Sequence, residues 1–204
     1  MPRPRSLTPD RLASAALSVL DRDGLAGLSM RTVAKELGMS TMALYRYVAD
    51  REELELLVVE SVLGAVDTGA PAADLPWRER VEIMVRRMRD TLSAHPSVTP
   101  LSVAHRHHSR AVLRWSETVL GILTDAGFAG GRRVVALRAL IAYVNGALQL
   151  AHLGALSGPG TAAISALAPE EFPLMAETAR AAQGVDAEQE FFGGLAVLLR
   201  GLDA

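Results

Sequence analysis

Residues 28–54 read LSMRTVAKELGMSTMALYRYVADREEL, and this stretch decides the fold of the N-terminal part of the chain. Two short segments with helical spacing of apolar residues lie on either side of Gly38. Ser29 precedes the first segment and Ser40 precedes the second. Serine is a favoured N-cap, and glycine permits a tight turn between two helices. The stretch therefore predicts two short helices joined by a sharp turn, which is helix-turn-helix organisation.

Longer helices are expected on both sides of this stretch. Thr8 as N-cap, followed by Pro9, opens a helix that Gly24 is expected to stop. The sequence Asp50-Arg-Glu-Glu53 has the form of a capping box, and it opens a helix that runs to about residue 67. Three helices before residue 50 thus form a compact head, and a fourth connects the head to the rest of the chain.

The second short helix, residues 40–48, has the side chains that reading DNA requires. Leu44 and Val48 are its expected buried pair, which leaves residues 41–43 and 45–47 to point outward. Small or hydroxyl side chains at its start can approach base edges or a thymine methyl, and tyrosine or arginine suits phosphate. An alternative is a plain three-helix bundle with a solvated face. The predicted DNA-binding residues are Arg31, Ser40, Thr41, Met42, Ala43, Tyr45, Arg46, Tyr47 and Arg51, and Arg3 and Arg5 form a basic arm before the first helix.

Charge is distributed unevenly along the chain of 204 residues, whose formal net charge is −2. Residues 1–51 carry eight Lys or Arg and five Asp or Glu, a balance of +3, and the remainder carries −5. A basic head on a larger acidic body indicates that the head meets an anion. The chain has no cysteine, which excludes a disulfide scaffold and a Cys-based zinc site and fits a cytoplasmic protein. The N-terminus has no apolar segment typical of a signal peptide.

Helical periodicity continues through the rest of the chain, and no convincing strand is found. The expected helices after residue 68 are 77–95, 101–107, 110–126, 132–155, 169–183 and 187–202, with a loop at 157–160. The predicted fold is all-α. It has a three-helix helix-turn-helix DNA-binding domain at 1–52, a connecting helix at about 51–67, and a helical ligand-binding and dimerisation domain at 68–204.

Residues 28–54 resemble the DNA-binding signature of the TetR family of transcriptional repressors, and the match covers about residues 8–60. The resemblance implies a homodimeric, all-helical protein that usually represses and that releases DNA when a small ligand binds its C-terminal domain. It places Tyr45 at the family's phosphate-contacting tyrosine, and Thr41, Met42, Ala43 and Tyr47 at base-reading or groove-facing positions. Arg51 stands where lysine is usual, and Val48 where an aromatic residue is common. The body resembles the tetracycline-repressor-like subgroup more weakly, at His95-Pro96, residues 125–128 and residues 191–202.

Helices 132–155 and 187–202 are expected to form the dimer interface. The first is apolar nearly all round except for a stripe of Arg138, Asn145, Gln149 and His152. The apolar stripe of the second is too wide for a helix packed on one side only. A wholly internal core is the alternative for the last helix, and a narrow solvated stripe is the alternative for the polar residues. The predicted interface residues are Arg138, Gly146, Phe191, Leu195, Leu198 and Leu202.

A ligand pocket in the body is predicted from adaptable methionine, flat tryptophan and a few polar groups. The predicted ligand-binding residues are Met84, Met88, His95, His105, Trp115, Asn145 and Gln149. An ordinary core is the alternative. His105, His107 and His108 invite a metal site, but no carboxylate is close in sequence and arginines flank them, so a solvated histidine cluster is favoured. We expect neither a metal nor a cofactor.

The function that these features predict is a DNA-binding repressor gated by a small molecule. Its expected partners are double-stranded DNA with a palindromic operator, an unidentified small-molecule effector and a second copy of the chain. No membrane is expected, because polar residues interrupt the apolar helix 132–155. No Gly-rich phosphate loop, HExxH or GxSxG occurs, so the chain is not expected to be an enzyme. The alternatives are a ligand-independent regulator or architectural protein, or a helical ligand-binding protein with enzymatic activity.

Overall fold

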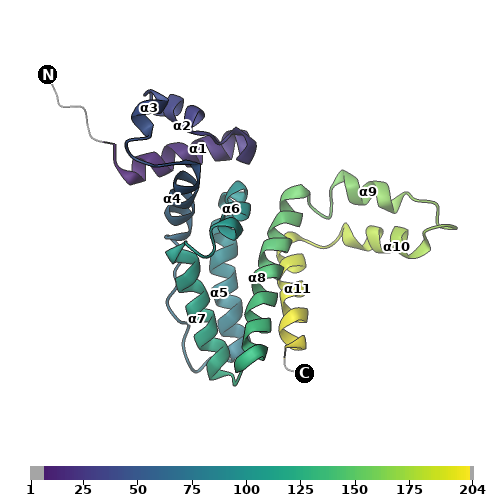
Figure 1. Ribbon diagram of the computed structural model, residues 1–204. Helices are drawn as coiled ribbons and strands as arrows, with labels where there is room; N and C mark the ends of the chain where they lie inside the picture. Colours follow the sequence, from purple (N-terminus) through teal and green to yellow (C-terminus); the bar gives the residue numbers. More distant parts are fainter. Residues whose placement is uncertain (1–6, 203–204) are drawn as a thin grey trace. The chain divides into compact units, whose positions relative to one another are not determined.

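The computed structural model describes residues 7–202, in which every regular element is a helix and no strand occurs (Figure 1). The chain divides into two compact units, residues 1–128 and 129–204. These units are defined by contacts within the chain, and they do not test the predicted functional domains at 1–52 and 68–204, which stay a prediction. The first unit contains α1 (Pro9–Gly27), α2 (Met30–Glu36), α3 (Thr41–Leu44), α4 (Arg51–Leu63), α5 (Trp77–Ala94), the 3-10 helix η1 (Pro96–Val98), α6 (Thr99–Ala104) and α7 (Arg110–Asp125). The second unit contains α8 (Gly130–Leu153), α9 (Pro159–Ser165), α10 (Pro173–Ala182) and α11 (Ala187–Gly201).

The expected caps start the helices of the head. The Thr8 side chain accepts from the backbone N–H of Arg11 at the start of α1. Ser29 and Thr32 form a reciprocal capping box at α2, and the Ser40 hydroxyl accepts from the N–H of Ala43 at α3. Each cap pairs a backbone donor that the first turn of a helix leaves unsatisfied. The local sequence alone therefore accounts for where these helices begin.

The core of the head lies between α1, α2 and α4. Leu12, Val19 and Leu20 of α1 are buried, as are Leu44 of α3 and Val48 just after it. The prediction that Leu44 and Val48 form the buried pair of this segment is confirmed. These two side chains seat α3, because a helix of four residues does not form stably without tertiary contacts.

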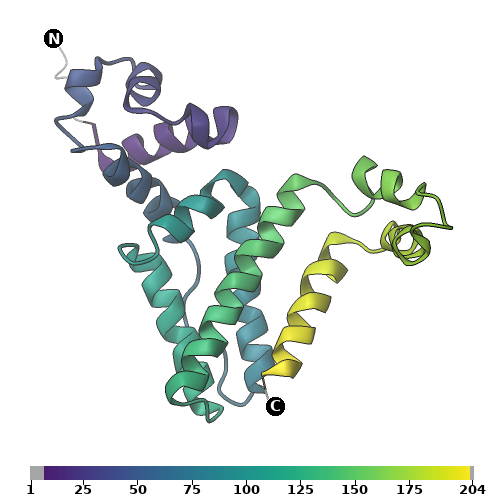
Figure 2. The same cartoon turned by 45° about the vertical axis from the view of Figure 1, so that its right-hand side comes forward.

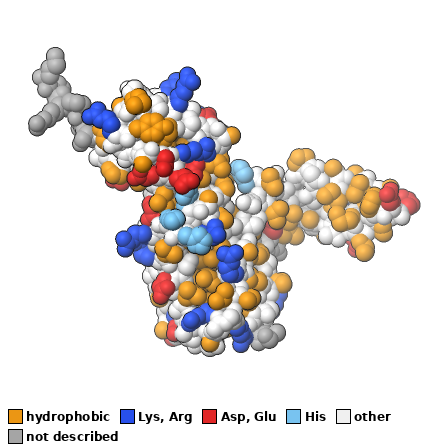
Figure 3. Space-filling view, viewed as in Figure 1, with side chains coloured by type: hydrophobic (Ala, Val, Ile, Leu, Met, Phe, Trp, Pro, Cys, Tyr) orange, Lys and Arg blue, Asp and Glu red, His pale blue; other side chains and the backbone are white. Residues whose placement is uncertain are grey.

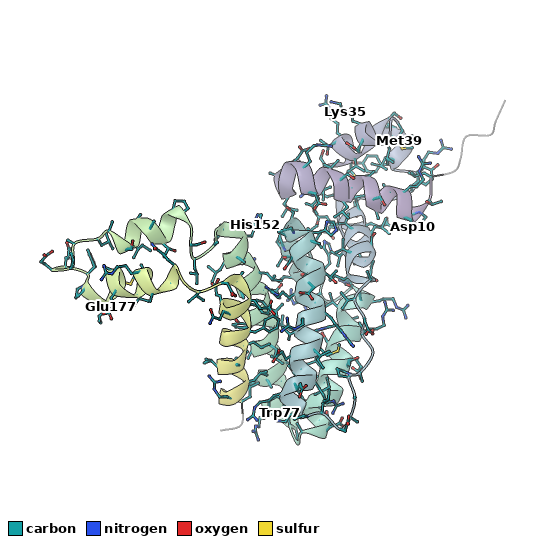
Figure 4. All side chains as sticks on the ribbon, turned by 180° about the vertical axis from the view of Figure 1, so that it is seen from behind. Asp10, Lys35, Met39, Trp77, His152 and Glu177 are labelled. Carbon is teal, nitrogen blue, oxygen red and sulfur yellow. The ribbon has the colours of Figure 1, made fainter. Side chains whose placement is uncertain are left out.

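The rest of the first unit is built on α5 and α7, which pack side by side. Trp115 of α7 is buried and its indole N–H donates to the backbone carbonyl of Met84 on α5 (2.9 Å). Trp77 stacks edge-on against Phe128, with ring centroids 5.2 Å apart. Within this unit, Lys35 and Met39 lie at the outer end of the head and Trp77 lies at the opposite end, as Figure 4 shows.

The second unit consists of the helix pair α8 and α11 and a hairpin made of α9 and α10 (Figure 2). Tyr143 of α8 donates to the backbone carbonyl of Phe191 on α11 (2.5 Å), and the two rings meet edge-on. A Cβ at Gly194 would collide with the Tyr143 ring, so this glycine permits the two helices to approach closely here. The hairpin leaves Leu174 and Met175 exposed, and Figure 3 shows apolar side chains over much of it.

Several helix boundaries differ from the expected ones. Gly24 has φ 68° and kinks α1, but helical turns resume and continue to Gly27. The segment expected to be a loop at 157–160 contains the start of α9, because Pro159 occupies the first turn, where proline is tolerated. The helix expected at 169–183 begins only at Pro173.

Helices α4 and α6 of the first unit are both shorter than expected. The helix expected to run to about residue 67 ends at Leu63, with Gly64 as its C-cap. The helix expected at 101–107 spans Thr99–Ala104, and residues after it form a turn. In that turn the backbone N–H groups of His108 and Ser109 both bond to the carbonyl of His105 (2.9 Å each).

Candidate nucleic-acid interface

The segment around α3 presents a continuous set of exposed side chains. Met42 is 76% exposed, and Tyr45 and Tyr47 are exposed as well. Thr41 and Ala43 are half-buried at the same end of the segment. All of these residues come from α3 and the turn that follows it, so the segment can enter a groove of DNA without moving the core residues below it.

The turn between α2 and α3 fixes the direction of this segment. Gly38 has φ 67°, in the left-handed region that favours glycine. Its N–H donates to the carbonyl of Lys35 (3.1 Å), and the N–H of Met39 donates to the carbonyl of Ala34 (2.9 Å). These bonds close the C-terminal end of α2 in the manner of a Schellman motif. The predicted sharp turn is therefore present, with glycine at the position that requires it.

The other predicted DNA-binding residues surround the α3 segment. Arg46 is exposed just after α3, and Arg31 is exposed in the first turn of α2. The Ser40 hydroxyl serves as the cap of α3, which still leaves its oxygen able to donate to another group. Arg3 and Arg5, the predicted basic arm, lie outside the described residues. The contact of each of these residues with DNA stays a prediction.

Arg51 stands at the first residue of α4 and is held by two contacts. Its Nε–H donates to Oε1 of Glu55 (2.6 Å), and its Nη2 donates to the carbonyl of Leu25 at the end of α1 (3.3 Å). The side chain remains 48% exposed. The predicted cap at Asp50 is present, because its side chain accepts from the N–H of Glu53 (2.9 Å). The predicted capping box is not closed, because Glu53 accepts from the N–H of Ala49 (2.6 Å), one residue before the N-cap.

Two carboxylates of α4 attach this helix to the helices that follow it in the first unit. Oε2 of Glu55 lies 2.9 Å from Nε2 of His105, which follows α6. Glu60 accepts from the Ser109 hydroxyl and from the N–H of Ala111 (3.2 Å) at the start of α7. Sequence reasoning missed Glu55 and Glu60, because their partners lie about fifty residues away and no local pattern connects them.

These contacts correct the prediction of a solvated histidine cluster at His105, His107 and His108. His105 was expected to be solvated, but its side chain is 12% exposed and faces the carboxylate of Glu55. His95 likewise bonds through Nδ1 to Asp21 of α1 (2.8 Å), so it links the body to the head. His107 and His108 are exposed. Among residues 7–202, no group of His, Cys, Asp or Glu is arranged to hold a metal ion.

The remaining predicted ligand-binding residues fall in two places. Met84, Met88 and Trp115 are each buried in the first unit. Asn145 and Gln149 lie on α8 of the second unit, where Gln149 is exposed. The Asn145 amide donates back to the carbonyl of Ile141 (2.8 Å), and its buried Oδ1 has no hydrogen-bond partner within the described part of the chain. Their role in binding a ligand stays a prediction.

The predicted interface residues on α11 are placed differently from those on α8. Phe191 and Leu195 are buried within the chain itself, and Leu198 and Leu202 are half-buried. The exposed side of α11 instead includes Gly193 and Val197, the latter 63% exposed. Sequence periodicity found the apolar side of the helix but could not tell an internal contact from an external one. The predicted α8 residues, by contrast, lie near solvent, with Arg138 exposed and Gly146 half-buried.

Two family descriptions match nearly the whole chain between them. Residues 12–56 match "Bacterial regulatory proteins, tetR family", and residues 70–204 match "Tetracyclin repressor-like, C-terminal domain". The HTH-type transcriptional repressor DrrR1 of Streptomyces coeruleorubidus is 34% identical over 148 residues, which are 72% of this chain and 54% of DrrR1. The chain thus matches about half the length of this curated relative.

Solved structures of the same kind superpose on the chain over nearly its full length. ActR of Streptomyces coelicolor in complex with actinorhodin has a TM-score of 0.80 at 25% identity, covering 98% of this chain and 96% of ActR. BioQ of Mycobacterium smegmatis has a TM-score of 0.71 at 28% identity, covering 97% and 98%. BioQ has also been solved with its double-stranded DNA operator, with a TM-score of 0.68 at 25% identity and the same coverage.

Proposed function

Because this chain belongs to the TetR family of transcriptional regulators, we propose that it is a sequence-specific DNA-binding repressor that a small-molecule ligand releases from its operator. The observation that carries the proposal is the rigidly seated α3 segment, whose side chains are exposed while Leu44 and Val48 beneath it are buried. A buried anchor under an exposed short helix is the arrangement that major-groove reading requires. The DNA operator bound by the related BioQ supports this reading.

In this proposal some residues of the interface read the bases, and neighbouring residues position the protein by contacting phosphates. Thr41, Met42 and Ala43 meet base edges, because they are small or flexible side chains at the start of the exposed helix. Tyr45, Arg46 and Arg51 meet phosphates, because a phenol or a guanidinium donates well to an anionic oxygen. Arg51 keeps the positive charge at the start of α4 and adds the planar donor geometry that lysine lacks.

A second copy of this chain is the proposed partner of the exposed side of α8. Val135 and Leu153 on this side are 65% and 82% exposed, and Arg138 and Gln149 share it. Helix α8 is long and apolar enough to cross a membrane by length and composition. The polar side chains on its exposed side favour a protein surface over lipid as the covering partner. Two α3 segments must stand about 34–36 Å apart to enter successive major grooves of a palindromic operator, and a homodimer supplies two such segments.

The ligand is proposed to bind in the helical body and to act through α4. The related ActR has been solved with actinorhodin, which supports a small-molecule ligand for this chain. A ligand weakens operator binding only by its difference in affinity between the two conformations. Helix α4 is the connection, because Glu55 and Glu60 attach it to the body while Arg51 reaches the DNA-facing surface. A regulator of this kind acts in the cytoplasm, where the DNA is, and has no catalytic role.

Selection from a library of random duplexes tests the proposal. The purified protein is expected to enrich one palindromic sequence with half-sites one helical turn apart. Thr41→Ala is expected to change the base preference at one position of each half-site, with little effect on overall affinity for random DNA. Enrichment of no sequence would refute base reading by α3, and an enriched sequence that Thr41→Ala leaves unchanged would refute base reading by Thr41.

A further inference from the structure

Contacts at the start of α4 connect Arg51 to a turn in the body of the first unit. Glu55 is the residue between them, because its two carboxylate oxygens hold different partners. Oε1 accepts from Nε of Arg51 (2.6 Å), and Oε2 lies 2.9 Å from Nε2 of His105. One carboxylate therefore joins a residue at the DNA-facing surface to the turn that follows α6.

Of the three side chains in this series of contacts, Glu55 and His105 lie in the interior and Arg51 lies at the surface. The side chains of Glu55 and His105 are each 12% exposed, whereas that of Arg51 is 48% exposed. A guanidinium held at Nε by a buried carboxylate has a fixed plane, and its outer N–H groups remain available to an anion. The carbonyl of Leu25 holds Nη2 from the other side (3.3 Å). Arg51 is thus oriented before any phosphate arrives.

The turn at residues 105–109 holds α4 at a second carboxylate as well. The Ser109 hydroxyl donates to Glu60, and the N–H of Ser109 donates to the carbonyl of His105 (2.9 Å). The turn is therefore closed on itself and contacts α4 through His105 and through Ser109. The position of His105 beside Glu55 is therefore fixed by the turn.

We propose that Glu55 and His105 are positioning residues for the contact of Arg51 with a DNA phosphate. The inference rests on the proposed function. Glu55 reduces the side-chain freedom that Arg51 loses on binding phosphate. His105 holds the second oxygen of Glu55 and so keeps the first directed at Arg51.

Binding to a fluorescent duplex of random sequence, measured over a range of salt concentrations, tests this chain of contacts. Such binding is dominated by phosphate contacts, and its salt slope reports how many there are. Arg51→Ala is expected to weaken binding about tenfold and to reduce the slope by about one. Glu55→Ala and His105→Ala are each expected to weaken binding about threefold, the effect of one newly mobile side chain.

The decisive comparison is the effect of Glu55→Ala in protein that already carries Arg51→Ala. If Glu55 acts through Arg51, the second substitution has no further effect on affinity or on the salt slope. If Glu55→Ala weakens binding threefold in both backgrounds, its role is merely structural and the proposal is overturned. Glu55→Gln keeps an oxygen that can accept from Arg51, and it is expected to bind closer to wild type than Glu55→Ala does.

Glu52→Ala is the matched control, because it removes a negative charge from the same turn of α4 at an exposed position. It is expected to leave binding unchanged or slightly stronger, since it only reduces repulsion of the phosphates. If Glu55→Ala behaves as Glu52→Ala does, the positioning role is refuted while the proposed function stands. If the wild-type protein shows no salt-dependent binding to DNA, both the proposed function and the inference that rests on it are refuted.

Discussion

Replacing Leu44 with alanine tests whether the exposed α3 segment depends on one buried anchor. Leu44 is 0% exposed and is the only buried residue of this four-residue helix. The change removes three carbon atoms, worth about 0.8 kcal/mol each in transfer free energy, and leaves a cavity that adds about 1 kcal/mol. We therefore expect the free energy of unfolding to fall by about 3 kcal/mol. Val48 beside it is also buried, and its collapse into the space would lower this figure.

Urea unfolding followed by circular dichroism, at a fixed protein concentration, measures the loss of stability for Leu44→Ala. DNA affinity is measured in parallel at a low temperature, where the variant remains folded. We expect sequence-specific binding to be lost while the helix content stays near that of wild type, because α3 contributes few residues to the signal. Met42→Ala is the control: its side chain is 76% exposed, so stability should change by less than about 0.5 kcal/mol. A stability within about 1 kcal/mol of wild type for Leu44→Ala, or unimpaired specific binding, would refute the anchoring argument.

Three further predictions follow from single residues. Gly38→Ala places a side chain at φ 67° in open space, so strain alone should cost about 1 kcal/mol of unfolding free energy and weaken DNA binding, as urea unfolding and anisotropy would show. Tyr45→Phe should weaken binding to specific and scrambled duplexes by the same factor, because a phosphate contact carries no sequence information; a loss confined to the specific duplex would contradict this role. Burial, and then the charge of Glu190, raise the pKa of Tyr143 above its usual value of 10.0. This raised pKa means that the folded state favours the neutral phenol, and the resulting stability is fully present below about pH 10 and is lost as the pH rises through the pKa of the folded state. The urea midpoint should therefore fall more steeply above about pH 10 in wild type than in Tyr143→Phe.

Local sequence patterns predicted the head well. Ser29, Ser40 and Asp50 cap the helices that they were expected to cap, and Gly38 makes the expected turn. Each of these features depends on residues within five positions of one another, so the local sequence is enough to predict it. The all-helical fold follows from the same kind of local information.

Contacts between distant residues could not be predicted in this way. His105 was expected to be solvated because no carboxylate is near it in sequence, but Glu55 reaches it from α4. Phe191 was predicted as an interface residue from periodicity alone, which did not reveal that Tyr143 covers it within the chain; its contact with a second subunit stays a prediction. Periodicity identifies which side of a helix is apolar, whereas the identity of what covers that side depends on the tertiary fold.

Comparing affinity for a duplex from the chain's own upstream region with affinity for a scrambled duplex, at about 0.15 M salt, tests the central claim most directly. Size and stoichiometry are determined on the same complexes. Our account predicts an affinity ratio of about a thousandfold or more, with a dimer bound to each palindromic site. Equal affinities for the two duplexes, both lost as salt is raised, would contradict it for that region. The same result with a duplex enriched from a random library would show that α3 does not read sequence.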